Sequence, residues 1–90
     1  MLRPKPISRF KKDLKKFQHK QYLLDALDEI LNKLIKQQEL EPKYCDHPLT
    51  GEWKGSRECH IKPDVLLVYR VDEKAKLLIL ERIGSHAELF

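Results

Sequence analysis

The spacing of apolar residues changes halfway along the chain, from the period of a helix to the period of a strand. Between residues 23 and 35, apolar side chains recur at three- and four-residue intervals in a stretch without Gly or Pro, which predicts a long amphipathic helix. From residue 57 onward, apolar residues alternate with polar ones or form short continuous blocks, as they do in strands. Helices in the first half and strands in the second half predict an α+β fold.

A shorter helix is predicted before the long one. Ser8 is a suitable N-cap, and apolar residues follow it at the i, i+4, i+7 spacing of a helix face: Phe10, Leu14 and Phe17. A break is expected between residues 18 and 21, and the second helix is expected to end near Gln37 or Gln38. Residues 39–50, which include two prolines and show no sustained periodicity, are interpreted as a loop.

Turn-forming residues separate the predicted strands, which span residues 51–55, 57–62, 65–71 and 77–83. Ile7 is a candidate for an additional strand at the edge. We expect the two N-terminal helices to pack on one face of this small, mainly antiparallel sheet. The opposite face is then free to carry a concave site.

The size of the chain allows one small hydrophobic core, so we expect a single domain over residues 1–90. The two cysteines, Cys45 and Cys59, allow one disulfide at most, which excludes a disulfide-rich secreted scaffold. No apolar run approaches the ~18 residues of a membrane span, and no apolar stretch follows the basic N-terminus as it would in a signal peptide. The sequence therefore predicts a soluble cytoplasmic protein with reduced cysteines and no membrane partner.

The net charge of +4 conceals an uneven distribution. Residues 1–20 contain eight Lys or Arg residues and one acid, Asp13, so this segment alone carries +7, and the remaining residues sum to −3. A concentrated positive field attracts nucleic acid or an acidic protein. A solvated helix face would give the same pattern.

Three of the four histidines fall after residue 46: His47 in the loop, His60 on a strand, and His86 after the last strand. Period-two alternation places Glu58 and His60 on one face of their strand and Cys59 on the other. An acid and an imidazole on the open face could form a proton-transfer pair. A surface hydrogen bond between the two is the alternative.

A series of motifs in the second half resembles the YafQ-type toxins of bacterial toxin-antitoxin systems, within the RelE-like superfamily. The matching segments are Asp46-His47-Pro48-Leu49, Gly51, Trp53-Lys54, Arg57-Glu58-Cys59-His60, Lys62-Pro63-Asp64, Leu66-Leu67-Val68-Tyr69, Arg82-Ile83-Gly84-Ser85-His86 and Leu89-Phe90. They occur in the family's order and spacing over residues 46–90. Some members of the family have Asp where Glu58 stands.

The resemblance implies a RelE-like fold and an endoribonuclease that cleaves translated mRNA in the ribosomal A site, where it also contacts ribosomal RNA. It implies a reaction without a metal or another cofactor, and inhibition by a cognate acidic antitoxin in a hetero-oligomeric complex. The 2′-hydroxyl of a ribose attacks the adjacent phosphate, which requires a base, cationic groups and an acid for the leaving oxygen. Imidazoles suit proton transfer because their ordinary pKa lies near working pH.

By similarity, the catalytic residues are predicted to be His47, His60, Asp64 and His86. His86 is the predicted leaving-group acid, and His60 or His47, oriented by Asp64, is the predicted base. Glu58 is assigned a supporting role without direct proton transfer. The residues predicted to bind substrate are Lys54 and Arg57, through phosphate, and Phe90, through stacking on a base.

Two other functions fit parts of the pattern. A non-catalytic basic module could use the same surface to bind RNA or the ribosome. A zinc protein could use the three histidines, Asp64 and a thiol, but no close ligand pair of the C-x2-C or H-x3-H kind is present. Ser85 and Glu88 also fit a capping box, in which case His86 would have no part in catalysis.

Overall fold

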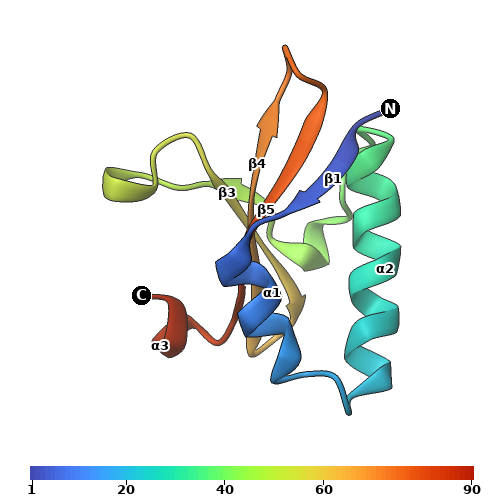
Figure 1. Cartoon of the computed structure of the whole chain (residues 1–90), viewed down its shortest axis with the longest axis vertical. Helices are drawn as coiled ribbons and strands as arrows, with labels where there is room; N and C mark the ends of the chain where they lie inside the picture. The colour runs from blue at the N-terminus through green and yellow to red at the C-terminus, as the bar shows by residue number, and fades with distance from the viewer.

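Five strands form one sheet in a computed structural model of the whole chain, residues 1–90 (Figure 1). In chain order the elements are β1 (Arg3–Pro6), α1 (Ser8–Lys15), α2 (Gln21–Ile35), the 3-10 turn η1 (Pro42–Tyr44), β2 (His47–Pro48), the 3-10 turn η2 (Gly51–Trp53), β3 (Arg57–Lys62), β4 (Val65–Asp72), β5 (Leu77–Gly84) and α3 (His86–Leu89). The strand order is β1-β5-β4-β3-β2. The predicted α+β class is confirmed.

The sheet is antiparallel except at one edge. Strands β2 to β5 pair antiparallel, and β1 pairs parallel to β5. Both prolines of β1, which lack an N–H, are tolerated because this strand has a neighbour on one side only. The predicted edge strand therefore exists, although it ends at Pro6 and Ile7 follows it, donating its N–H to Leu80 O at 3.1 Å.

Helices α1 and α2 cover one face of the sheet and form the main core with it (Figure 1). Leu23, Leu27 and Ile30 of α2 are buried against strand residues such as Leu67 and Leu78. The other core members from β3, Cys59 and Ile61, lie on this side as the alternation predicts. No helix is long or apolar enough to cross a membrane.

The opposite face is only partly open. Leu89 of α3 packs there on Leu66 and Val68 of β4, with Leu49 and Trp53 beside them. In Figure 1, α3 and the η2 loop lie on the side of the strands away from α2. This small second core leaves a hollow between α3, η2 and β3.

Two local predictions were wrong. Residues 51–55 do not form a strand, because Gly51 and Gly55 adopt positive φ angles of 67° and 97°, outside the extended region. Gly51–Trp53 forms the turn η2 instead, and the strand that borders β3 is His47–Pro48. Ser8 is not the N-cap of α1 either: Ile7 occupies that position, and no side chain caps the helix.

Helix α2 ends two residues before the predicted position. Gln37 adopts a left-handed conformation (φ 56°), its N–H bonds to Leu34 O, and Gln38 N–H bonds back to Lys33 O at 2.9 Å. This is a Schellman arrangement, which satisfies the last carbonyl groups of the helix. Because the residue in the left-handed conformation is Gln37 and not a glycine, the sequence carries no signal that the helix ends here.

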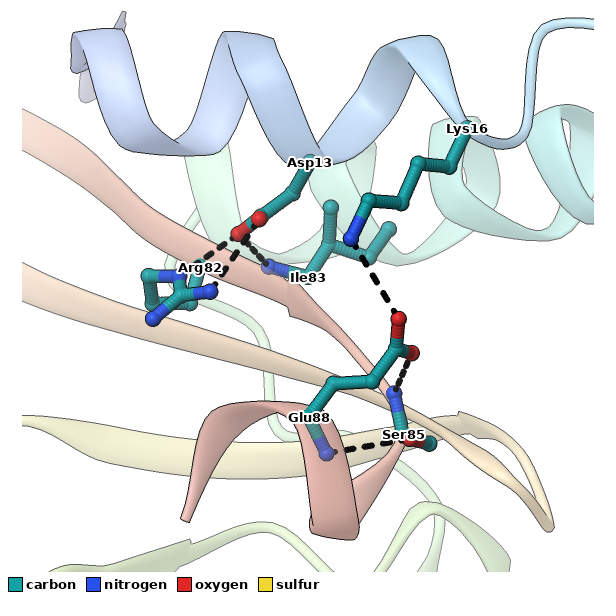
Figure 2. Close-up of polar contacts among 6 residues, drawn as sticks. All are labelled: Asp13, Lys16, Arg82, Ile83, Ser85 and Glu88. Atoms are coloured by element: carbon teal, nitrogen blue, oxygen red, sulfur yellow. Dashed lines mark hydrogen bonds and ion pairs between the residues drawn. The ribbon is translucent and has the colours of Figure 1, made fainter.

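Asp13 connects α1 to β5 at the point where β5 has no outer neighbour (Figure 2). Its carboxylate accepts hydrogen bonds from Arg82 Nε at 2.7 Å and from the backbone N–H of Ile83 at 3.2 Å. Burial by itself would raise the pKa of Asp13, but these two bonds outweigh it and hold the pKa below its ordinary 3.8.

The Asp13 contacts predict a loss of stability in acid. Because the folded-state pKa is lower than the unfolded one, the stabilisation is complete above pH 3.8 and is lost as the pH falls through the folded-state value. In urea unfolding, the difference in free energy between the native protein and Asp13→Asn should be constant above about pH 5 and shrink below about pH 4. A difference that stays constant down to about pH 2 would contradict this role.

Candidate active site

A hollow of about 440 Å³ opens on the face of the sheet away from α1 and α2. Its lining brings together His47 and Glu58 from the β2–β3 pair, His86 and Phe90 from the C-terminal segment, and Leu49, Thr50 and Trp53 from the loop between β2 and β3. Four of these residues, His47, Glu58, His86 and Phe90, are sequence-predicted site residues. The hollow is therefore the candidate active site.

Glu58 carries the negative charge of the hollow and is only 6% exposed. Its Oε1 atom lies 3.5 Å from His47 Nε2 and 3.9 Å from His60 Nε2. The β2–β3 register, in which His47 stands opposite Glu58, makes the first of these contacts, and the alternation along β3 makes the second. One buried carboxylate thus faces two imidazoles.

The hydrogen bonding of His47 defines its orientation. Its Nδ1 atom lies 3.2 Å from the carbonyl oxygen of Pro48, to which it can donate, and its Nε2 atom points to Glu58. The imidazole is about half exposed, so solvent or a ligand can reach it. Such a ring, held by a carbonyl on one side and a carboxylate on the other, is suited to proton transfer.

The predicted capping box is present in α3. Ser85 Oγ accepts a hydrogen bond from Glu88 N–H at 3.2 Å, and Glu88 Oε1 accepts one from Ser85 N–H at 3.0 Å. These bonds, together with Lys16 of α1 at 3.4 Å, lower the pKa of Glu88 (Figure 2). The cap orients the short helix and does not engage the imidazole of His86, which lines the hollow.

An aromatic pair forms the outer wall of the hollow. The ring of Phe90 lies edge-on to Trp53 with 5.4 Å between centroids, and 5.1 Å from the imidazole of His86. Phe90 is 47% exposed. Trp53 was not among the predicted site residues, and its position inside the matching motif was the one signal for a place in the site.

Arg57 lies on the other side of the sheet from this hollow. Its Nε atom lies 3.3 Å from Asp46 Oδ1, the same oxygen that accepts a 2.6 Å hydrogen bond from the hydroxyl of Tyr69. Burial and the Asp46 carboxylate raise the pKa of Tyr69, so the phenol stays protonated and donates. Arg57 therefore does not line the hollow: with Tyr69 it anchors, through Asp46, the segment that carries His47, and its contact with phosphate stays a prediction.

Two other predicted residues stand apart from the hollow. Asp64 is exposed in the turn between β3 and β4 and makes no side-chain hydrogen bond or ion pair, so it does not orient an imidazole in this structure. Lys54 is exposed directly after Trp53 and also forms no ion pair. Its ammonium group is free to meet an anion beside the aromatic wall.

The side chains around the hollow do not form a metal site. No three His, Cys, Asp or Glu side chains are placed to hold a metal ion together. In particular, the His47–Glu58–His60 set shares one carboxylate oxygen between the two rings instead of directing three groups to a common point.

Comparisons with known proteins show the family to which this chain belongs. The family model described as the bacterial toxin of type II toxin-antitoxin system, YafQ, matches residues 2–90. The mRNA interferase toxin YafQ of Escherichia coli strain K12 is 40% identical over 82 residues, which cover 90% of this chain and 87% of that protein. A metal-bound toxin from Helicobacter pylori is 46% identical with a TM-score of 0.92, with full coverage of both chains.

A solved complex adds a partner to these relatives. The E. coli DinJ-YafQ complex contains a chain that is 36% identical to this one, with a TM-score of 0.86 and coverage of 100% of this chain and 99% of that chain. The match to the family model extends over nearly the whole sequence, including the N-terminal helices. The chain therefore belongs to the YafQ family of bacterial type II toxins.

Proposed function

We propose that this protein is a ribosome-dependent endoribonuclease that cleaves mRNA in the A site without a metal. The supporting observation is that the imidazoles of His47 and His86 line one hollow with the buried carboxylate of Glu58, while His60 Nε2 lies 3.9 Å from the same carboxylate. The relatives named mRNA interferase toxin YafQ support the choice of mRNA as substrate. The working place of such an enzyme is the cytoplasm, where ribosomes translate.

The reaction is a transesterification at phosphorus. The ribose 2′-oxygen loses its proton to a base and forms a bond to the adjacent phosphorus, while the bond from phosphorus to the 5′-oxygen breaks and that oxygen gains a proton. The products carry a 2′,3′-cyclic phosphate and a 5′-hydroxyl. No redox change occurs, so a base, an acid and a cationic environment are sufficient.

The roles follow from the positions of the rings. His47 or His60 takes the 2′-proton, and Glu58 stabilises the imidazolium that forms because its carboxylate faces both rings. His86 on α3 protonates the leaving oxygen from the far side of the hollow.

Substrate binding uses the aromatic wall. Phe90 is exposed enough to stack on an unpaired base, and Trp53 holds its ring from the side. Lys54 follows Trp53 and offers a cation to a phosphate beside that base. A base stacked here leaves the adjoining phosphate within the hollow.

The products identify the mechanism. Cleavage of mRNA on translating ribosomes should survive chelation by EDTA, provided that ribosome integrity is controlled, because proton transfer by imidazoles needs no ion. End mapping should find cyclic phosphates and 5′-hydroxyls. Products with 5′-phosphates that appear only after addition of a divalent ion would exclude this chemistry, and intact RNA would favour a non-catalytic RNA-binding module.

The partner that silences the toxin is proposed to be a cognate acidic antitoxin. The side chains of Arg9, Lys11, Lys12 and Lys15 on α1 are all exposed, so the positive charge of residues 1–20 faces solvent. The DinJ-YafQ complexes of relatives support a hetero-oligomer.

Salt should weaken the encounter with the antitoxin. Because opposite charges speed association and ions screen them, the association rate should fall by about tenfold or more between low and physiological ionic strength. Stopped-flow measurement of the two proteins at a series of salt concentrations checks this. A rate that does not depend on salt would show that the α1 charges play no part.

A further inference from the structure

A second and larger cavity, of about 590 Å³, lies next to the candidate active site. It is enclosed by α2, the turn η1 and the end of β3, and its wall includes His60, Lys62, Lys43, Tyr44 and Glu29. Strand β2 pairs only with Arg57 and Glu58, so the outer edge of β3 beyond Glu58 has no neighbouring strand here. Backbone as well as side-chain groups are therefore available to a ligand.

The two cavities share a border at Glu58. His47 lines the first cavity and His60 the second, and both imidazoles face the same carboxylate oxygen, at 3.5 Å and 3.9 Å. The reacting groups therefore lie between two recesses instead of at the bottom of one. An enzyme that cuts within a continuous chain has to hold the nucleotides on both sides of the broken linkage.

The wall of the second cavity suits a nucleotide. Lys43 and Lys62 bring two ammonium groups to a wall that holds one carboxylate, Glu29. Lys43 Nζ also lies 4.0 Å from the exposed Glu41, which is outside the wall, and no carboxylate lies within ion-pair distance of Lys62. The ring of Tyr44 is half-buried and already attracts a cation, with Lys43 Nζ 5.2 Å from its centroid. Aromatic rings beside cations are the usual elements of a site for single-stranded nucleic acid.

We propose that this cavity is a second nucleotide subsite, which binds the RNA on the side of the cleaved linkage opposite to Phe90. Lys43 and Lys62 contact its phosphates and Tyr44 contacts a base. The subsite rests on the proposed endoribonuclease function and adds the path that the RNA follows across the protein: from Trp53 and Phe90, over Glu58, to Tyr44.

The first test measures binding without cleavage. NMR spectra of the isotope-labelled full chain are recorded with 2′-O-methyl RNA of two and of four nucleotides, which lacks the attacking hydroxyl. The longer RNA is expected to shift the signals of both cavities, including Lys62 and Tyr44. Shifts confined to His47, His86 and Phe90 with the four-nucleotide RNA would overturn the subsite.

The second test removes the charges. In the variant Lys43→Gln with Lys62→Gln, the KM for ribosome-bound mRNA is expected to rise about tenfold with kcat nearly unchanged, since the contacts hold the substrate in its ground state. For the 2′-O-methyl RNA, the slope of log K against log salt is expected to decrease by about 1.4, since each phosphate contact of a single strand contributes about 0.7.

A matched control separates this effect from net charge. Lys36→Gln with Lys74→Gln removes the same charge from exposed positions at the end of α2 and in the β4–β5 turn. In this variant the rise in KM and the decrease in the salt slope should both be much smaller. If the two double variants behave alike, the subsite is wrong. If the native chain binds RNA through both cavities yet cuts no mRNA, the proposed function fails and the second cavity is an RNA-binding site of a non-catalytic module.

Discussion

Replacing His86 by alanine is expected to slow RNA cleavage by ~10²- to 10⁴-fold while the melting temperature stays nearly unchanged. The imidazole is exposed, forms no side-chain hydrogen bond and contacts the ring of Phe90, so its loss opens no cavity in the core. Cleavage of ribosome-bound mRNA and thermal unfolding measured on the same preparations separate chemistry from stability. The pH dependence of kcat should lose its alkaline limb in the variant, because the group that donates the proton is gone.

Two variants in the same segment serve as controls. Leu89→Ala removes a buried side chain that packs on Leu66 and Val68, and it should cost about 2–5 kcal/mol of stability. Phe90→Ala should lose up to ~1–3 kcal/mol of base stacking with little effect on unfolding. If His86→Ala instead melts many degrees lower and activity falls only in proportion to folded protein, His86 is structural.

Removing the carboxylate of Asp46 should affect both stability and activity. Asp46→Ala leaves the hydroxyl of Tyr69, a residue that is 2% exposed, without its acceptor, which should cost about 1–3 kcal/mol. His47 follows Asp46 directly, so loss of the anchor also frees the ring from its position against Glu58. Cleavage should fall by about tenfold or more beyond the effect of partial unfolding, because small misplacements of a catalytic group cost up to about 10²-fold.

Conservative substitutions identify the origin of this loss. Asp46→Asn keeps an acceptor for the hydroxyl of Tyr69 and should recover most of the stability and activity. Tyr69→Phe removes the hydroxyl itself, while Arg57 still reaches the carboxylate of Asp46. NMR contacts between the ring of His47 and the side chain of Glu58 report the position of His47 directly. Asp46→Ala with unchanged contacts and full activity per folded molecule would contradict the anchor.

The secondary structure was largely predictable because it depends on local patterns. Residues 57–62 form a strand with the predicted bounds, since Pro63 and Asp64 end it, and the turn after β4 follows from its run of polar residues. The alternation along β3 also placed Cys59 on the helix side correctly. Burial of every second residue is a property of a strand wherever it lies.

The predictions that were wrong concern backbone torsion angles and helix caps. Gly51 and Gly55 read as part of an extended segment, yet their positive φ angles turn the chain into η2. At Gly55 the guanidinium group of Arg70 lies 3.2 Å from where a Cβ would stand, a contact with a residue fifteen positions away. Such contacts leave no periodic signal in the sequence.

Local patterns along the chain were enough for the α+β class and the order of the main elements, and the resemblance to a toxin family gave the candidate histidines. Tertiary structure decided which of these residues meet. His47 stands opposite Glu58 because of the β2–β3 register, and the contact of Arg57 with Asp46, at 3.3 Å, exists only in the folded loop. The physical reason is that periodicity records burial along one element, whereas a site depends on distances between elements that are far apart in the chain.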